Sequence, residues 1–210
     1  MKDSAKKTAE FLLQINAIKL QPSNPFTWAS GWKSPIYCDN RKTLSFPGVR
    51  SYIRDSFSDL IKDLYPGAQL IAGVATGAIA HGALVADKLG LPFIYVRSGA
   101  KEHGLGNQIE GYFEKGQKVV VVEDLISTGG SSLNAVTALR DAGCDVLGMV
   151  AIFTYEFKKA ADAFSAAACK LDTLSNYSVL VGEAVKSGYI GESEVETLKK
   201  WRVDPASWGI

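Results

Sequence analysis

Apolar runs alternate with stretches of helical spacing in the middle of the chain. The apolar runs lie at 69–75, 92–96, 118–124 and 144–155, and the helical stretches at 78–90 and 131–143. This alternation is typical of βαβ units, in which parallel strands form one sheet and helices cover both of its faces. The pattern therefore predicts the α/β class, with a central parallel sheet flanked by helices.

The two ends of the chain have a different pattern. Helical spacing predicts helices at 4–18 and 48–65 near the start, and at 177–187 and 191–201 near the end. Residues 20–46 are rich in proline, serine, asparagine and aromatic side chains, which predicts irregular structure with short strands. Because no repeat or linker interrupts the chain, we expect residues 1–210 to form a single domain.

Composition narrows the classes of partner. Hydrophobic residues make up 47% and charged residues 21%, and the formal net charge is +1. A net charge this close to zero produces only a weak overall electrostatic field, which does not favour a nucleic-acid partner. No apolar run approaches the ~20 residues that a membrane span needs, and the charged N-terminus has no signal-peptide core. Three widely spaced cysteines suit a reducing compartment, so a cytoplasmic location is expected.

A glycine-rich segment with three cations follows the second apolar run. Residues 98–111 contain four glycines and few apolar side chains, which predicts a long loop of the kind that is usually functional or disordered. Arg97, Lys101 and His103 lie within seven residues of one another here. Taken alone, such charges fit a solvated loop as well as an anion site.

Two acids follow the most apolar run. Glu123 and Asp124 come directly after four valines. Because neighbouring residues of a strand point to opposite faces, we expect both acids to serve one ligand only if they lie where the chain leaves the strand. Ligands of open α/β sheets bind at this carboxyl end of the strands.

A Ser-Thr-Gly-Gly-Ser turn, at Ser127–Ser131, follows the acids and opens a predicted helix. Its small residues let backbone amides approach an anion, and a helix N-terminus adds partial positive charge. Carboxylates beside a phosphate site suit a ligand that carries hydroxyl groups next to its phosphate. Ribose 5-phosphate is such a ligand.

Together, the apolar strand, the two acids and the turn resemble the signature of the type I phosphoribosyltransferases, which bind phosphoribosyl pyrophosphate (PRPP). The resemblance implies that the acids hold the ribose 2′- and 3′-hydroxyls and that the turn surrounds the 5′-phosphate. It predicts that PRPP is bound by Arg97, Lys101, His103, Glu123, Asp124, Leu125, Ile126, Ser127, Thr128, Gly129, Gly130 and Ser131.

The cationic loop is similar to the catalytic loop of one branch of this family, the orotate phosphoribosyltransferases, with the pattern Arg-Lys-x-x-Lys-x-His-Gly. The matching residues are Arg97, Lys101, His103 and Gly104, whereas Ser98 replaces the pattern's first lysine. The resemblance implies that the loop closes over the pyrophosphate. It also implies a homodimer in which each 97–111 loop serves the partner's active site.

Other segments resemble the same branch. Residues 25–41 are similar to its hood over the base, and residues 72–78 to its pyrophosphate loop, with Gly77 where some members have lysine. Residues 1–46, with parts of the C-terminus, are thus expected to form the hood, and residues 69–155 the PRPP-binding core. The orotate-binding candidates are Ser127, Tyr155 and Arg41.

The resemblance implies transfer of the phosphoribosyl group from PRPP to N1 of orotate, giving orotidine 5′-monophosphate and pyrophosphate in UMP biosynthesis. Its expected catalytic residues are Lys101, Arg97, His103 and Asp124. Its expected cofactor is Mg²⁺, held mainly by PRPP, with Glu123 or Asp124 as candidates for contact through water.

Two alternatives remain open. The first is a phosphoribosyltransferase that acts on a purine base, against which the cationic loop argues. The second is a regulator that binds PRPP without catalysis. Such proteins often carry a basic face or a DNA-binding domain, and this chain has neither a basic excess nor a spare domain.

Overall fold

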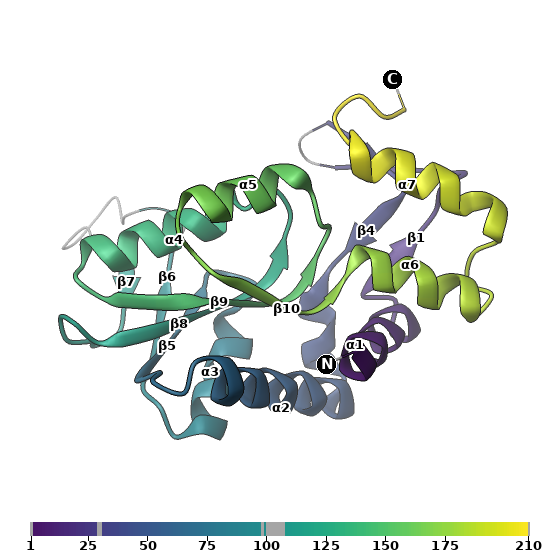
Figure 1. Cartoon of the computed structure of the whole chain (residues 1–210). Helices are drawn as coiled ribbons and strands as arrows, with labels where there is room; N and C mark the ends of the chain where they lie inside the picture. Colours follow the sequence, from purple (N-terminus) through teal and green to yellow (C-terminus); the bar gives the residue numbers. More distant parts are fainter. Residues whose placement is uncertain (1, 29–30, 98, 100–107, 210) are drawn as a thin grey trace.

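A six-stranded sheet forms the centre of the computed structural model, which describes residues 2–28, 31–97, 99 and 108–209 (Figure 1). The strand order is β10-β9-β8-β5-β6-β7, and every neighbouring pair is parallel except β6 with β7. The strands are β5 (Leu70–Val74), β6 (Phe93–Val96), β7 (Ile109–Glu110), β8 (Lys118–Ile126), β9 (Asp145–Thr154) and β10 (Leu171–Asn176). The predicted α/β class with a mainly parallel sheet is confirmed.

Helices cover both faces of this sheet. Figure 1 shows α2 (Pro47–Leu64) and α3 (Ile79–Leu89) on one face, and α4 (Gly130–Asp141) and α5 (Lys158–Ala166) on the other. The valines of β8 divide between these faces with the period of two that a strand imposes. Val120 and Val122 pack with α2 and α3, whereas Val119 and Val121 pack with α4 and α5.

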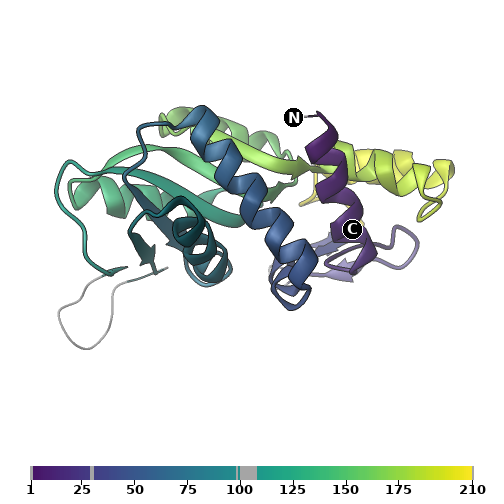
Figure 2. The same ribbon diagram turned by 90° about the horizontal axis from the view of Figure 1, so that it is seen from below.

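A second group of elements packs beyond the β10 edge of the sheet (Figures 1 and 2). Strand β1 pairs with β4 and β2 with β3, both antiparallel. The elements are α1 (Lys2–Gln14), β1 (Ile18–Leu20), β2 (Phe26–Thr27), β3 (Lys33–Ser34), β4 (Ile36–Cys38), the 3-10 helix η1 (Asn40–Ser45), α6 (Tyr177–Lys186), the 3-10 helix η2 (Glu192–Glu194) and α7 (Val195–Val203). None of the described helices has both the length and the apolar character needed to cross a membrane.

The predicted elements differ from the observed ones at several points. Strand β7 (Ile109–Glu110) lies within residues 98–111, which were predicted to be a loop. The helix expected at 4–18 ends at Gln14, because Asn16 adopts a left-handed conformation (φ 53°) and Ile18 enters β1. The apolar pattern also missed α5 and β10. Strand β10 has the sequence LDTLSN, in which no apolar run marks a strand, and it pairs with the longer β9.

Candidate active site

A cavity of about 340 Å³ lies at the carboxyl ends of β5 and β8. Three segments line it: the end of β4 with the start of η1, the turn between β5 and α3, and the end of β8 with the start of α4. The parallel strands β5 and β8 bring the last two of these segments to one edge of the sheet, where α/β proteins bind ligands. The lining residues are Cys38, Asp39, Arg41, Val74, Ala75, Thr76, Gly77, Glu123, Asp124, Leu125 and Ser131.

The two acids lie within β8 rather than beyond it, so the expectation that the chain has already left the strand is wrong. Strand β8 continues to Ile126 because it still pairs with β9 there. Glu123 follows the face of Val119 and Val121, is 4% exposed, and accepts a hydrogen bond from Ser132 of α4 (2.9 Å). Asp124 points to the opposite side. Both still reach the cavity wall.

The Asp124 carboxyl group lies against Gly77 in the turn between β5 and α3. A Cβ atom added at Gly77 would overlap all three atoms of this carboxyl group. A larger side chain at this position could fit only if Asp124 moved. The glycine therefore lets the turn and the carboxylate occupy one wall of the cavity together.

Burial changes the proton affinity of this acidic pair. Desolvation, and then the charge of Asp124, raise the pKa of Glu123 to about 8. Desolvation also raises the pKa of Asp124, and the nearby charge of Arg41 opposes that shift. At neutral pH, in the absence of ligand, the pair therefore retains a proton.

This proton makes stability depend on pH. An unfolded glutamate has a pKa of about 4.3, so the raised folded value contributes stability that is present below that pH and is lost as the pH rises through about 8. We expect Glu123→Gln to flatten this dependence, so that the free energy of unfolding of the variant exceeds that of the parent at pH 9 by a few kcal/mol. Thermal unfolding between pH 5 and 9 measures this pH dependence, and Glu192→Gln, at an exposed position, is the control. Parallel curves for parent and Glu123→Gln would contradict the shift.

A backbone anion site opens α4. Gly129 precedes this helix with φ 84°, a left-handed conformation that favours glycine, and α4 begins at Gly130. The first amides of a helix have no partner within it and point outward. Ser127 and Thr128, at the start of the Ser127–Ser131 turn, are half-buried, and of this turn only Ser131 lines the cavity together with Asp124. The first turn of α4, whose amides and dipole favour an anion, is thus at the cavity.

The predicted cations fall into three groups. Arg41 lines the cavity and pairs with Asp39 (Nε–Oδ1 2.7 Å), and this neighbour raises the pKa of the guanidinium. Arg97 lies just after β6, outside the lining, with Nη1 3.7 Å from Oε1 of Glu110. Lys101 and His103 lie outside the described residues. Among the described lining residues, Arg41 is thus the only basic one.

Tyr155 has a different environment from the one predicted for an orotate contact. Its ring is 2% exposed and packs among Trp28, Phe157 and Trp201, with ring centroids 5.3–5.6 Å apart. Burial raises the pKa of its hydroxyl. This cluster joins the short strands to α7, so packing accounts for the burial of Tyr155. Its contact with orotate stays a prediction.

The sequence interpretation gave no role to two residues of the cavity wall. Cys38 and Asp39 line it together with Arg41, although only Arg41 was singled out. The one local signal was the spacing of Asp39 and Arg41, which is short enough for the ion pair that the structure contains. Their proximity to Asp124 depends on tertiary contacts that no local pattern marks.

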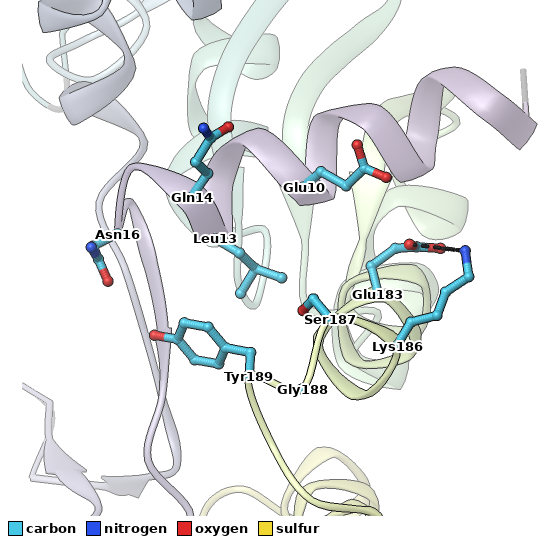
Figure 3. Close-up of a pocket in the computed structure, with 9 residues that line it drawn as sticks. All are labelled: Glu10, Leu13, Gln14, Asn16, Glu183, Lys186, Ser187, Gly188 and Tyr189. Carbon is cyan, nitrogen blue, oxygen red and sulfur yellow. Dashed lines mark hydrogen bonds and ion pairs between the residues drawn. The ribbon is translucent and has the colours of Figure 1, made fainter.

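Larger cavities occur elsewhere, and size alone does not identify the site. Figure 3 shows a cavity of about 690 Å³ between α1 and the end of α6, lined by Glu10, Leu13, Gln14, Asn16, Glu183, Lys186, Ser187, Gly188 and Tyr189. Its Glu183 is paired with Lys186 at 3.2 Å. The cavity is remote from the carboxyl ends of the parallel strands and from the α4 amides.

Comparisons with known proteins agree with this geometry. The family model described as "Phosphoribosyl transferase domain" matches residues 47–187. The orotate phosphoribosyltransferase of Porphyromonas gingivalis is 57% identical over 210 residues, which span 100% of both chains. That of Bacteroides fragilis is 59% identical over 208 residues, 99% of this chain and 98% of the relative.

A solved structure extends the likeness to the fold. The crystal structure of orotate phosphoribosyltransferase from Aeropyrum pernix has a TM-score of 0.75 and 27% identity, covering 87% of this chain and 99% of that one. The match to full-length relatives and the acidic strand beside the α4 amides lead to the same conclusion: the chain belongs to the orotate phosphoribosyltransferase family.

Proposed function

We propose that this chain transfers the 5-phosphoribosyl group of PRPP to N1 of orotate, giving orotidine 5′-monophosphate and pyrophosphate in UMP biosynthesis. It is thus a glycosyltransferase, as its family membership indicates. The observation that carries the proposal is that one cavity is lined by a carboxylate, Asp124, and by Ser131 in the first turn of α4. A sugar phosphate with free hydroxyls is complementary to that combination.

The ribose 5-phosphate half of PRPP fits the β8–α4 segment. Asp124 accepts hydrogen bonds from the ribose hydroxyls, while the backbone and hydroxyls of 125–131 hold the 5′-phosphate. Glu123 supports Asp124, because its Oε1 accepts the Asp124 N–H (3.0 Å). The proton held by the acidic pair leaves when ligand hydroxyls become the donors.

Mg²⁺ fits this site as a companion of PRPP. Within the described residues, no group of three or more His, Cys, Asp or Glu side chains could hold a metal ion by itself. Mg²⁺ commonly uses one or two carboxylates, several waters and substrate phosphates. Asp124 and Glu123 at the cavity wall are the candidates for contact through water. When bound, Mg²⁺ supplies charge stabilisation to the departing pyrophosphate.

The leaving pyrophosphate needs donors that the described cavity largely lacks. We assign this role to Lys101, Arg97 and His103 of the 97–111 loop, which add charge-assisted hydrogen bonds as pyrophosphate departs. Arg97 would then exchange its ion pair with Glu110 for a phosphate contact. No covalent nucleophile is required, because the anomeric carbon becomes cationic as the bond breaks.

Orotate would approach from the side of the short strands. Arg41 and Ser127 are its proposed contacts, since a carboxylate ligand needs a cation and hydrogen-bond donors. The proposal retains residues 1–46, with parts of the C-terminus, as the hood and 69–155 as the PRPP-binding core. The packing of Trp28 against Trp201 of α7 supports a hood built from both ends of the chain.

The proposal also includes a cytoplasmic homodimer that shares the 97–111 loops between its active sites. All three cysteines are free thiols, which suits a reducing compartment. A loop that serves the partner's site would also complete a cavity in which Arg41 is the only basic residue among the described lining residues.

Gly77→Ala should impair the active site while leaving the stability of the fold nearly unchanged. The added methyl group would displace the Asp124 carboxylate, so we expect kcat/KM for PRPP to fall about tenfold or more. Because the group that yields is a side chain at the cavity wall, the unfolding free energy should change by less than about 1 kcal/mol. Steady-state kinetics and thermal unfolding measure both. The control is Gly48→Ala, because an added Cβ at Gly48 has no neighbour within 4 Å. Unchanged kinetics for Gly77→Ala would show that Asp124 need not move.

The choice of base tests the proposed function directly. The loss of orotate absorbance in the near ultraviolet is followed with PRPP and Mg²⁺, with adenine, hypoxanthine, guanine and uracil in parallel. We expect turnover of orotate alone. Conversion of a purine instead would retain the PRPP site but refute the assigned base, and PRPP binding without turnover of any base would favour a regulator.

A further inference from the structure

A buried chain of hydrogen bonds connects η1 to the acidic strand and to α3. Asn40, Thr43 and His81 are each no more than 2% exposed. The Asn40 amide nitrogen donates to the backbone carbonyl of Asp124 at 2.6 Å. The Thr43 hydroxyl donates to the backbone carbonyl of Asn40 at 2.6 Å and lies 3.2 Å from Nε2 of His81. Three segments around the cavity are thus linked by polar groups that do not line it.

The contact at Asp124 lies beyond the point where β5 stops pairing with β8, although β9 still pairs with β8 there. Strand β5 pairs with β8 only as far as Val122, two residues before Asp124. A buried carbonyl needs a donor, and Asn40 provides one from outside the sheet. The Asp124 carbonyl is therefore bound by a side chain, in a segment whose flanking residues Glu123 and Leu125 pair with β9.

The orientation of the Asn40 amide is fixed from its other end. The Cys38 thiol lies 3.3 Å from Oδ1 of Asn40 and donates to it, which leaves Nδ2 for the Asp124 carbonyl. Burial lowers the pKa of His81 to about 4, so the imidazole is neutral at physiological pH. The side chains of Asn40, Thr43 and His81 are thus uncharged, and the hydrogen bonds between these residues and their neighbours hold their geometry.

We propose that Asn40 is a positioning residue for PRPP binding, which fixes the Asp124 peptide so that its carboxylate faces the ribose hydroxyls. This inference rests on the proposed function of Asp124. A residue that only stabilised the fold would affect both substrates alike. Asn40 instead acts through one peptide at the PRPP subsite, so its loss should weaken PRPP binding selectively.

Thr43 provides a matched comparison. It is as buried as Asn40 and belongs to the same network, but it contacts Asn40 and His81 rather than Asp124. Thr43→Val removes the hydroxyl with little change of shape. It should lower stability as Asn40→Ala does, without releasing the Asp124 peptide.

The experiment compares Asn40→Ala, the similarly shaped Asn40→Leu and Thr43→Val in the full chain, below their unfolding temperatures. Loss of one well-placed hydrogen bond to the site should raise both the KM for PRPP and the Kd for PRPP with Mg²⁺ about tenfold in the Asn40 variants. The KM for orotate and the constants of Thr43→Val should stay within about twofold. If Asn40→Ala does not fold, Asn40→Leu keeps the test available, since it preserves the shape and removes the donor without adding a charge.

Direct calorimetric titration with PRPP separates the possible failures. A parent protein that binds no PRPP would overturn the proposed function itself. A parent that binds PRPP, with Asn40 variants that bind it equally well, would overturn only the role of Asn40. Equal losses in Asn40→Ala and Thr43→Val, or equal effects on PRPP and orotate, would reduce Asn40 to a structural residue and overturn the proposal.

Discussion

Asp124→Asn is expected to lower kcat/KM for PRPP by about 100-fold, because two charge-assisted hydrogen bonds to the ribose hydroxyls are lost. An ionised carboxylate only accepts hydrogen bonds, whereas an amide presents a donor group to one of the hydroxyls. The loss should occur without unfolding. Burial raises the pKa of Asp124, so removing its charge should leave the fold as stable as before or more so.

The measurement is steady-state kinetics beside thermal unfolding. Asp39→Asn is the matched control, because Asp39 lines the same cavity but pairs with Arg41; its kcat/KM for PRPP should fall less than that of Asp124→Asn. An Asp124→Asn variant with parental kinetics would show that the ribose lies elsewhere. A variant that lost activity only in proportion to lost folded protein would also count against the assigned role.

Lys101→Ala is expected to lower kcat by about 10²–10³-fold, the usual loss when a donor to developing negative charge is removed. The reason is chemical: pyrophosphate accumulates charge as it leaves, and a lysine stabilises that charge more in the transition state than in the ground state. The KM for orotate should change little. Single-turnover rates with saturating PRPP measure the effect. Lys115→Ala, on the exposed turn before β8, serves as the control. An unchanged rate for Lys101→Ala would show that Lys101 takes no part in the mechanism.

Mixing the two inactive variants tests the shared loop. In a dimer of one Lys101→Ala and one Asp124→Asn subunit, a loop that crosses to the partner leaves one site with both residues intact. Since random mixing makes half of the dimers mixed, with one of two sites restored, activity should recover to about a quarter of the parental value. If each loop serves its own subunit, every site has one defect and no activity returns.

Much of the sheet could be predicted from periodicity, because its central strands are buried on both faces and form apolar runs. The four valines of β8 and the helices that follow β5 and β8 belong to this class. Strand β10 could not be predicted in this way, since its pairing with β9, rather than its own composition, makes it a strand.

The site was predictable where function leaves a local pattern. The acids and the Ser127–Ser131 turn are contiguous, so their chemistry could be inferred before their geometry was known. The directions of the acids were not, because the end of β8 depends on its pairing with β9. The contact of Asn40 with Asp124 joins positions 84 residues apart, and Tyr155 is placed by aromatic packing from both ends of the chain.

A crystal structure with PRPP and Mg²⁺ bound tests the central claim most directly. We predict that the 5′-phosphate lies on the amides of 127–131, that the ribose hydroxyls lie within hydrogen-bonding distance of the Asp124 carboxylate, and that Asn40 still donates to the Asp124 carbonyl. A ligand bound instead in the cavity between α1 and α6, or a ribose turned away from Asp124, would contradict the account.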